Sequence, residues 1–525
     1  MGKLVFLINL KPSSHRTAEE SLGVQYLASV LESLDFEVSI LDNWLDSSMT
    51  NKDVYEVIMK QKDDICFVGT SSYMLSNSPT IELITKLKED GINVVAGGYG
   101  PTFESEIFLR AGVDFVCIGE GEKTIIDVAN YFSGKLISKN DIRGVGYLED
   151  GELNYTFKQH QVQNLDEVKF PTRPLIKLLK KRKSTVNILT SRGCMGKCSF
   201  CSVSAFGEKQ VGKKWRGRSI SDIVKELKFL QAQGVGIVKL IDDSFIENER
   251  DNQWCKTFAD ALEREGITMY FRASIRSDKV NMENMEHLKR AGFFSFSCGI
   301  ENGSESALKR MGKMASLNDN LNAIKCFREH DYYVQAGFIL FDNKTTLNEL
   351  KENYSFLSDN IDLVTKGIFS EMFAAKGTEF TYGLDNENGN QFSSNKLYEV
   401  EDGDARKVYR YLKKWQSNHI GIYDKVIDPI SAPKAIKLHR MKKYHELMVQ
   451  MKGIDLMFMQ DLIKQVESSG DLDALYYSYL QKYTPFFEKC QATVNHFYCV
   501  DELQYDADTN KFILFNNVQS TEEEG

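Results

Sequence analysis

The sequence predicts an α/β protein in three parts: an N-terminal Rossmann-like, doubly wound parallel sheet, a central partial (β/α)6 barrel of the TIM type, and a mainly helical C-terminal section. Three observations support this prediction. The 525 residues exceed what one hydrophobic core usually organises. Two series of short apolar runs alternate with amphipathic stretches, and a segment rich in proline and lysine separates the two series.

The first series fills the N-terminal third. Amphipathic stretches such as EESLGVQYLASVLESL stand between the apolar runs, and strands that alternate with helices form parallel, doubly wound sheets. The expected strands are 4–10 (LVFLINL), 38–41 (VSIL), 65–72 (ICFVGTSS), 92–98 (INVVAGG) and 115–121 (FVCIGEG). We expect the first domain to span residues 1–150.

Small residues follow three of these strands. They are Gly69, Thr70, Ser71, Ser72, Gly97, Gly98, Gly119 and Gly121, with Glu120 between the last two. Open α/β sheets bind ligands at the carboxyl ends of their strands, and glycine there lets a bulky cofactor approach the backbone. Glycine after a strand is also common in sheets without a ligand, so this pattern alone does not establish a cofactor site.

The second series follows an extended linker that we expect at 151–184, with Pro171 and Pro174 before a basic run. Six further strands are expected at 185–191, 237–245, 269–275, 293–303, 333–342 and 363–369. Six strand-helix units are too few for a closed eightfold barrel and fit an open partial barrel, whose chemistry collects at the carboxyl ends of the strands. We expect this domain to span residues 185–383.

The C-terminal section, 384–525, is rich in helix formers and aromatic residues, as in DARKVYRYLKKWQ. The apolar spacing predicts amphipathic helices in a small domain that covers the mouth of the barrel. The last ten residues, NNVQSTEEEG, are acidic, and we expect them to be a disordered tail.

Composition excludes several classes of function. A net charge of -9 argues against broad nucleic-acid binding. Basic stretches at 177–184 and 212–218 are more typical of a solvated linker and helix edge than of an RNA patch. No apolar run approaches the roughly 20 residues of a membrane span, and the first residues lack a signal-peptide cleavage site. We expect a cytoplasmic protein without a membrane or nucleic-acid partner.

The segment SRGCMGKCSFCSV places Cys194, Cys198 and Cys201 within eight residues. The other seven cysteines stand in apolar contexts that are typical of a core. A structural zinc site usually takes four ligands in two pairs, and the next cysteine is Cys255. A 4Fe-4S cube can take three thiolates from one tight loop and leave one iron open for chemistry. Zinc with a distant fourth ligand remains the alternative.

This C-x-x-x-C-x-x-C pattern, with Phe200 before the last cysteine, resembles the radical S-adenosylmethionine superfamily. The segments KKWRGRSISDIVKEL, LIDDSF, FRASIRSD, GIENGSESALKRMGK, GFILFDNKTTLNEL and MFAAKGTEF have the order and spacing of its methyltransferase-like members with an N-terminal cobalamin-binding domain. The segments GTSSYMLSN, VVAGGYGPTF and FVCIGEGEKT are similar to that cobalamin domain. The resemblance covers roughly residues 1–380.

The resemblance implies a set of site residues. Cys194, Cys198 and Cys201 would bind three irons, while the amino and carboxylate groups of S-adenosylmethionine chelate the fourth. The segment LIDDSF departs from the Gly-Gly-Glu stretch of many relatives, so Asp242 or Asp243 would accept from the methionine ammonium, or the second Asp would cap a helix. Further expected contacts of this cofactor are Phe200, Ser274, Arg276, Glu301 and Ile339, although the charged ones could equally form rim salt bridges. No catalytic side chain is assigned.

The resemblance also implies a function. A C-methyltransferase would use the 4Fe-4S cluster to generate a 5'-deoxyadenosyl radical from S-adenosylmethionine and methylcobalamin as the methyl donor. The alternatives are a cobalamin-dependent cyclase or rearrangement enzyme, a polar methyltransferase, and, outside the enzymes, a non-catalytic cobalamin- or metal-binding module. The expected partners are a low-potential electron donor of the flavodoxin or ferredoxin type and a small-molecule or peptide substrate. We expect a monomer.

The loop after the first strand predicts how cobalt is coordinated. Many cobalamin domains supply an imidazole from an Asp-x-His-x-x-Gly loop, but here His15 has serine two places before it and Ala18 three places after it. An imidazole without an orienting carboxylate is a poorer ligand. We therefore expect cobalamin to bind without histidine, with its lower face covered by the loops at 69–75 and 97–100.

Overall fold

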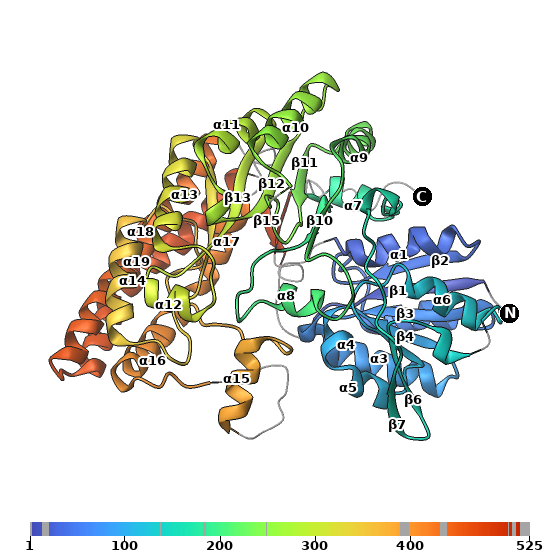
Figure 1. Ribbon diagram of the computed structural model, residues 1–525. Helices are drawn as coiled ribbons and strands as arrows, with labels where there is room; N and C mark the ends of the chain where they lie inside the picture. The colour runs from blue at the N-terminus through green and yellow to red at the C-terminus, as the bar shows by residue number, and fades with distance from the viewer. Residues whose placement is uncertain are drawn as a thin grey trace.

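The computed structural model describes residues 3–12, 20–136, 138–181, 185–247, 249–388, 398–430, 438–501, 503–506 and 511–514. Figure 1 shows three successive bodies along the chain: the N-terminal sheet (blue), the central sheet (green) and the C-terminal helices (orange and red). Helix α8 (Ser202–Gly207) lies between the first two bodies. The α/β class and the predicted order of its parts are confirmed.

The N-terminal sheet has seven strands in the order β2-β1-β3-β4-β5-β6-β7, and β1 to β5 pair in parallel. Every residue of β1 is buried, which explains its uninterrupted apolar run. The strands are β1 (Leu4–Asn9), β2 (Glu37–Asp42), β3 (Ile65–Ser71), β4 (Val94–Gly97), β5 (Phe115–Cys117), β6 (Val145–Glu149) and β7 (Glu152–Tyr155).

Strands β6 and β7 form an antiparallel hairpin that the sequence analysis did not predict. The turn contains Asp150 and Gly151 with φ of 50° and 83°, as a two-residue hairpin turn requires. The domain boundary predicted at residue 150 falls inside this turn, and the sheet continues to Tyr155.

Helices cover both faces of the N-terminal sheet, as a doubly wound fold requires. Alternate residues of β1 belong to two separate cores: Phe6 packs with α2, α3 and α5, whereas Leu7 packs with α1 and α6. The helices are α1 (Leu22–Glu32), α2 (Asn51–Met59), α3 (Asn77–Glu89), α4 (Tyr99–Phe103), α5 (Ser105–Arg110) and α6 (Thr124–Phe132).

The connector between the two sheets is anchored at Arg173, which is buried with φ of 88°. Its guanidinium binds Glu20 at 2.9 Å, ahead of α1, and Glu226 at 2.7 Å on α9 (Ile220–Ala232). Because a buried arginine must be paired, this one side chain fixes the N-terminal body to the central one. The short helix α7 (Ile176–Lys181) follows.

The central sheet is parallel, in the order β14-β13-β12-β11-β8. Its strands are β8 (Val186–Ile188), β11 (Ile237–Leu240), β12 (Tyr270–Arg276), β13 (Phe293–Glu301) and β14 (Tyr333–Phe338). The sixth expected strand, at 363–369, is present as isolated parallel bridges between Gln335 and Val364 and between Phe341 and Glu371. The helices that alternate with these strands are α9, α10 (Asn252–Arg264), α11 (Met282–Arg290), α12 (Glu305–Arg310), α13 (Leu317–Glu329) and α14 (Leu347–Asp359).

The C-terminal helices pack along the edge of the central sheet that the sixth segment forms. Lys452 Nζ donates to Leu363 O at 2.9 Å, and Gln416 Oε1 accepts from Ile368 N and Phe369 N. The elements are α15 (Glu379–Asn388), α16 (Gly403–Ser417), α17 (Ile420–Ile430), α18 (Leu438–Glu467), α19 (Leu472–Val500) and an unpredicted hairpin, β15 (Leu503–Asp506) with β16 (Lys511–Leu514). The acidic tail that we expect to be disordered lies outside the described residues.

No helix in the described part of the chain is long and apolar enough to span a membrane.

Candidate functional site

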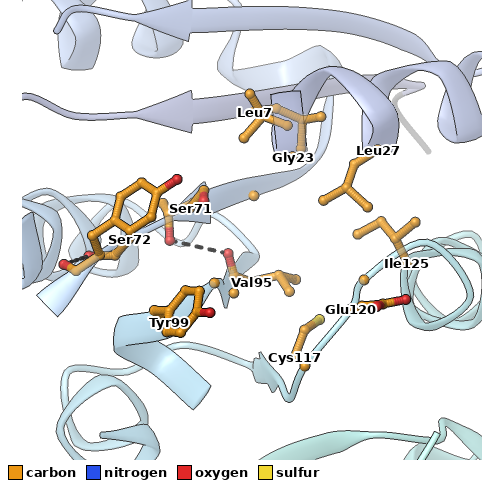
Figure 2. A pocket seen from close by; sticks show the side chains of 18 of the residues that line it. Leu7, Gly23, Leu27, Ser71, Ser72, Val95, Tyr99, Cys117, Glu120 and Ile125 are labelled. Carbon is orange, nitrogen blue, oxygen red and sulfur yellow. Dashed lines mark hydrogen bonds between the residues drawn. The ribbon is translucent and has the colours of Figure 1, made fainter. Parts of the chain in front are cut away.

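A cavity of about 210 Å³ opens at the carboxyl edge of the N-terminal sheet, where β1, β3, β4 and β5 end (Figure 2). Its wall is mostly apolar, with Leu7, Leu27, Val95, Cys117 and Ile125. The order β2-β1-β3 reverses direction at β1, and such a switch point is where open α/β sheets bind ligands. The wall includes all the small residues and the glutamate singled out in the sequence: Gly69, Thr70, Ser71, Ser72, Gly97, Gly98, Gly119, Glu120 and Gly121.

Two glycines leave this cavity open. A Cβ at Gly23 on α1 would meet no atom within 4 Å, although glycine weakens a helix by about 1 kcal/mol relative to alanine. Gly98 has φ of 93°, and its Cβ would lie 2.9 Å from Ser72 O, so a larger residue would be strained and crowded. The cradle fits a bulky cofactor that lies directly against the backbone.

No histidine lines the cavity among the described residues. His15 belongs to residues 13–19, which lie outside the described part of the chain. The expected absence of a histidine ligand to cobalt therefore stays a prediction.

A second cavity, of about 440 Å³, adjoins the first between α1, α8 and the hairpin of β9 (Ser191–Gly193) and β10 (Trp215–Gly217). The two cavities share four wall residues: Gly23, Tyr99, Glu120 and Phe206. The rings of Tyr99 and Phe206 stack with centroids 4.5 Å apart, so an aromatic pair stands where the cavities meet.

Ion pairs join the two bodies beside this second cavity. The Glu120 carboxylate accepts from Arg216 Nη1 at 3.0 Å and from Arg192 Nη1 at 3.1 Å, while Arg192 also binds Glu122. Although burial opposes it, the Arg192 guanidinium lowers the pKa of Glu122, so this pair is charged. Glu120 thus belongs both to the cavity wall of the first sheet and to the arginines of the second body.

The three cysteines lie on the loop that leaves β9 and ends at α8, where Cys201 is the N-cap residue. All three are half-buried free thiols, and Gly196 N donates to Cys194 Sγ at 3.3 Å. Burial raises the pKa of Cys194 to about 11 and also raises the pKa of Cys198 and Cys201. Thiolates replace these thiols when iron binds.

The loop brings three thiols close together in the sequence, and a 4Fe-4S cube can take each thiolate of such a loop on a different iron. In the described residues, no group of three His, Cys, Asp or Glu side chains forms a site for a single metal ion.

The two adjacent aspartates face different surroundings. Asp242 is buried and accepts from Thr190 N at 2.6 Å, Ser191 Oγ at 2.7 Å and Arg250 Nη1 at 3.3 Å, so protein donors occupy its carboxylate. Asp243 lines the second cavity and accepts from Gly193 N at 3.0 Å. Desolvation by the cavity walls raises the pKa of Asp243 to about 6.

Glu247 was not predicted from the sequence. Its Oε1 accepts from Met195 N at 3.2 Å and lies 3.5 Å from Cys194 Sγ, so the carboxylate borders the cysteine loop. The side chain is buried, and its Oε2 has no hydrogen-bond partner within the described residues. A buried carboxylate oxygen without a partner is costly, and a cationic ligand beside the cluster would satisfy it.

Arg276 lies on the same side of the loop. Asp278 binds its Nε and Nη2 at 2.9 Å and 2.8 Å, and its Nη1 lies 3.5 Å from Glu247 Oε1. Ser274, two residues earlier on β12, pairs with Ser297 on β13, and its carbonyl accepts from Phe245 N.

Glu301 ends β13 in the left-handed region, with φ of 63°, which is a strained conformation for a residue with a side chain. Its carboxylate binds Lys313 Nζ at 3.3 Å, and its carbonyl accepts from Ile339 N at 2.6 Å. Burial opposes the ammonium charge, but Glu301 together with Cys198 raises the pKa of Lys313, so the ammonium is retained beside the cysteine loop.

A third cavity, of about 400 Å³, lies between the N-terminal body and the cysteine loop. Phe200 and Ser202 come from the cysteine loop and the start of α8, and Ile339 follows β14. The rest of its wall comprises Tyr73, Met74, Leu75 and Tyr99 from the N-terminal body and Glu371, Phe373 and Ala375 from the segment after the sixth barrel position. Tyr99 therefore lines all three cavities.

Two protein-family models match this chain. The B12 binding domain matches residues 16–129, and the radical SAM superfamily matches residues 188–357. Fold and site thus define a protein with two cofactor domains, one for cobalamin and one for an iron–sulfur cluster and S-adenosylmethionine. The chain combines a B12-binding domain with a radical SAM domain, as cobalamin-dependent radical S-adenosylmethionine enzymes do. Its cofactors are a 4Fe-4S cluster, S-adenosylmethionine and cobalamin.

Similar proteins include methyltransferases and cyclases by name. An uncharacterized methyltransferase of Pyrococcus horikoshii is 28% identical over 346 residues, 65% of this chain and 73% of the relative. Anaerobic magnesium-protoporphyrin IX monomethyl ester cyclase of Synechocystis sp. is 26% identical over 332 residues, 61% of this chain and 64% of the relative. The structure of the radical enzyme OxsB with aqua-cobalamin and S-adenosylmethionine bound has a TM-score of 0.76 over 98% of this chain and 83% of that chain, at 17% identity.

Sequence reasoning missed Gly23, Tyr99 and Glu247. Gly23 could have been found, because it is the second residue of an amphipathic helix and glycine destabilises a helix. A glycine at such a position indicates that a side chain there would be in the way. Tyr99 and Glu247 had no local signal, since their importance comes from contacts with α8 and with the cysteine loop.

Proposed function

We propose that this protein is a cobalamin-dependent radical S-adenosylmethionine C-methyltransferase. The observation that supports this most is the third cavity, because it borders both cofactor regions. It shares Tyr73 and Tyr99 with the cobalamin cavity and receives Phe200 and Ser202 from the cysteine loop. A substrate carbon in this cavity can be reached from both sides. The methyltransferase name of the Pyrococcus horikoshii relative agrees with this function.

When bound, cobalamin would supply a transferable methyl group taken from one molecule of S-adenosylmethionine, and a second molecule at the reduced cluster would supply a carbon-centred radical. The chain holds the cofactors with different groups. Cys194, Cys198 and Cys201 bind three irons through their thiolates, as one loop can do. The wall from Gly69 to Ser72, with Gly97, Gly98 and the residues from Gly119 to Gly121, holds cobalamin by close backbone contact.

The methionine end of S-adenosylmethionine meets the charged side chains beside the cysteine loop. Glu247 Oε2, buried and without a described partner, accepts from the ammonium group. Arg276 Nη1 faces the methionine carboxylate, and Asp278 fixes the guanidinium plane. Glu301 accepts from the ribose hydroxyls, while Phe200 and Ile339 pack against the adenosine part. Asp243 is a second acceptor for the ammonium, and Asp242 is a buried partner of Arg250.

Aromatic side chains keep water from the reacting atoms. Tyr99 stacks on Phe206 and lies near Tyr73 and Phe103, at centroid distances of 6.5 Å and 6.1 Å. Burial raises the pKa of Tyr99, so its phenol stays protonated and does not offer an anionic ligand. A wall of this kind excludes solvent from a reactive intermediate.

Product analysis tests the proposal. The anaerobically reconstituted protein, given cobalamin, S-adenosylmethionine, substrate and a low-potential electron donor, should form 5'-deoxyadenosine and S-adenosylhomocysteine in comparable amounts. One molecule of S-adenosylmethionine supplies the radical and a second supplies the methyl group. S-adenosylhomocysteine without deoxyadenosine would indicate polar methylation instead.

A cyclase or rearrangement enzyme is the second candidate, and the similarity to the Synechocystis cyclase favours it. This function predicts deoxyadenosine without S-adenosylhomocysteine. A non-catalytic cobalamin- or metal-binding module predicts that neither product forms under strong reductant.

A further inference from the structure

We propose that the third cavity takes an apolar, ring-containing part of the substrate that carries an amine or another hydrogen-bond donor, and that it rejects phosphate and carboxylate groups. This inference rests on the proposed function, because it takes the cavity between the two cofactor regions as the substrate site.

The first argument is the exposed aromatic surface. Tyr73 is 42% exposed and Phe373 is 45% exposed, although both line a concave wall. Met74, Leu75, Tyr99 and Ala375 add further apolar and aromatic wall, while Ser202 and the two side chains assigned to the adenosine part, Phe200 and Ile339, complete it. Binding of a flat apolar group would remove these ring faces from water, which is favourable by roughly 25 cal/mol per Å² of buried apolar surface. It would also add ring-to-ring contacts. The walls therefore favour a ring or a short hydrocarbon body.

The second argument is charge. Glu371 is the charged residue among those that line the cavity in the described chain, and the wall contains no Lys, Arg or His. An anionic group here would face the Glu371 carboxylate, and the cation beside it, Lys413 Nζ, is already bound to both oxygens of that carboxylate at 3.1 Å and 3.2 Å. A phosphorylated or carboxylated substrate portion is therefore disfavoured, and a cationic or donor group is favoured.

The third argument is that Glu371 is held in place before a substrate arrives. Its backbone forms a parallel bridge with Phe341, and the next residue, Met372, donates to Phe341 O at 2.8 Å. On α16, Tyr409 OH donates to Glu371 Oε2 at 2.6 Å and Lys413 Nζ lies 3.1 Å from Oε1. A carboxylate offers about four acceptor positions, so capacity remains for a substrate donor.

The positions of these groups also orient the substrate. Tyr73 and Tyr99 stand on the side of the cobalamin cavity, as Figure 2 shows for Tyr99, whereas Glu371 and Phe373 follow the last barrel position. An amine bound at Glu371 places the opposite end of the substrate toward the cofactors. The reacting carbon is therefore remote from the donor group.

Three probes with one ring system test this assignment without turnover: 1-naphthylmethylamine, 1-naphthalenemethanol and 1-naphthoate. Their binding to the protein loaded with cluster, cobalamin and S-adenosylhomocysteine is measured anaerobically by fluorescence titration and equilibrium dialysis. We expect the amine to bind about tenfold more tightly than the alcohol, and the alcohol about tenfold more tightly than the carboxylate. Equal binding of all three, tighter binding of naphthoate, or no binding of any probe would overturn the assignment.

Variants locate the binding. Glu371→Gln should remove the preference for the amine and leave the alcohol unchanged, since the glutamine has the same shape without the charge. Lys413→Met should strengthen amine binding severalfold, because it frees the carboxylate, whereas Lys407→Met, an exposed site on the same helix, should change nothing. Phe373→Ala should weaken all three probes about tenfold. Unchanged probe binding in Glu371→Gln and Phe373→Ala would place the probes elsewhere and contradict the inference.

These outcomes are separate from those of the proposed function. Probe binding as expected with no S-adenosylhomocysteine in turnover would refute methyl transfer and keep the cavity assignment. Methyl transfer together with a preference for naphthoate would refute the cavity assignment and keep the proposed function.

Discussion

The two cofactor regions lie at the carboxyl ends of parallel strands, yet their walls differ in kind. Around the cavity that we propose for cobalamin, the described wall consists of glycine, hydroxyl-bearing and apolar side chains, with Glu120 as its charged member. Around the cysteine loop stand Glu247, Arg276, Glu301 and Lys313, all charged and mostly paired with one another. The first region is therefore suited to a large ligand that is held by shape, and the second to a small zwitterion that is held by charge.

This contrast separates the effects that substitutions should have. Substitutions that change side-chain volume should alter cobalamin binding, and substitutions that change side-chain charge should alter S-adenosylmethionine binding. A substitution in one cofactor region should leave binding of the other region's cofactor unchanged.

The largest effect should follow from replacing Cys194, Cys198 and Cys201 together with alanine. Iron and iron–sulfur absorbance should fall to background and cleavage of S-adenosylmethionine should stop, because the variant lacks the three thiolates that we propose as ligands of the cluster. Cobalamin binding should remain, since its cavity belongs to the other sheet. Cys499→Ser, at an exposed cysteine on α19, is the control. Stoichiometric zinc without iron–sulfur absorbance in the unmodified protein would contradict this prediction.

The next effect concerns shape. Gly23→Leu should lower cobalamin affinity about 100-fold, because the new side chain projects into a cavity where nothing lies within 4 Å. Cluster content and thermal stability should be retained, as leucine is a better helix former than glycine. Gly421→Leu on α17 has the same open surroundings and should not affect cobalamin. Wild-type cobalamin binding by the Gly23 variant would show that the cofactor does not use this cavity.

A charge change should give a smaller, selective effect. Glu247→Gln should weaken S-adenosylmethionine binding about 30-fold, because an ammonium loses its buried carboxylate partner. The glutamine keeps an acceptor for Met195 N, so cluster absorbance should not change. Glu249→Gln, at an exposed position two residues further, serves as the reference. If Glu247→Gln changed only cobalamin binding, the charged side chains beside the cysteine loop would not be the binding site of S-adenosylmethionine.

The smallest effect concerns Asp42, a buried aspartate in the N-terminal body. Burial raises the pKa of Asp42, at the end of β2, to about 6. The folded protein thus holds this proton more tightly than the unfolded chain, whose aspartates titrate near 3.9. The stability contributed by Asp42 is present below about pH 4 and is lost as the pH rises through about 6.

Asp42→Asn should raise the free energy of unfolding at pH 7 by about 2 kcal/mol and remove the decline between about pH 4 and about pH 6. The amide keeps an acceptor for Leu45 N. Asn9 Nδ2 now donates to Asp42 Oδ2 at 3.0 Å, so the Asn9 amide must turn over for its Oδ1, which has no partner within the described residues, to accept from the new NH₂. Urea unfolding across this pH range measures the effect, with the exposed Asp63→Asn as control. A lower stability of the Asp42 variant at pH 7 would mean that the carboxylate is favourable where it lies.

The first sheet and the cysteine loop could be predicted because their signals are local. Fully buried strands are continuous apolar runs, and a tight loop of three thiols needs no distant partner. The β6–β7 hairpin was not predicted, although Asp150 and Gly151 are typical of a two-residue hairpin turn. The sequence analysis expected only strand–helix units, whose strands pair in parallel, and this hairpin is antiparallel.

Other features depend on packing that no single stretch of sequence reveals. Asp242 and Asp243 are adjacent, and neighbouring side chains of an extended chain point in opposite directions, so one meets Arg250 in the core and the other meets the cavity. Asp242 turns inward to donors from Thr190, Ser191 and Arg250, two of which lie about fifty residues away in the sequence. The roles of Glu247 and Glu371 likewise arise only where distant loops meet.

Tyr99 borders the first, second and third cavities at once, and this limits how the enzyme can be redesigned. A smaller residue there would admit a bulkier substrate but would also enlarge the first cavity, which we propose for cobalamin, so a wider substrate range would come with a less tightly held cofactor. Phe373 and Ala375 border the third cavity and neither of the other two. Directed evolution of substrate range should therefore begin at that far wall, where the volume of one chamber can change alone.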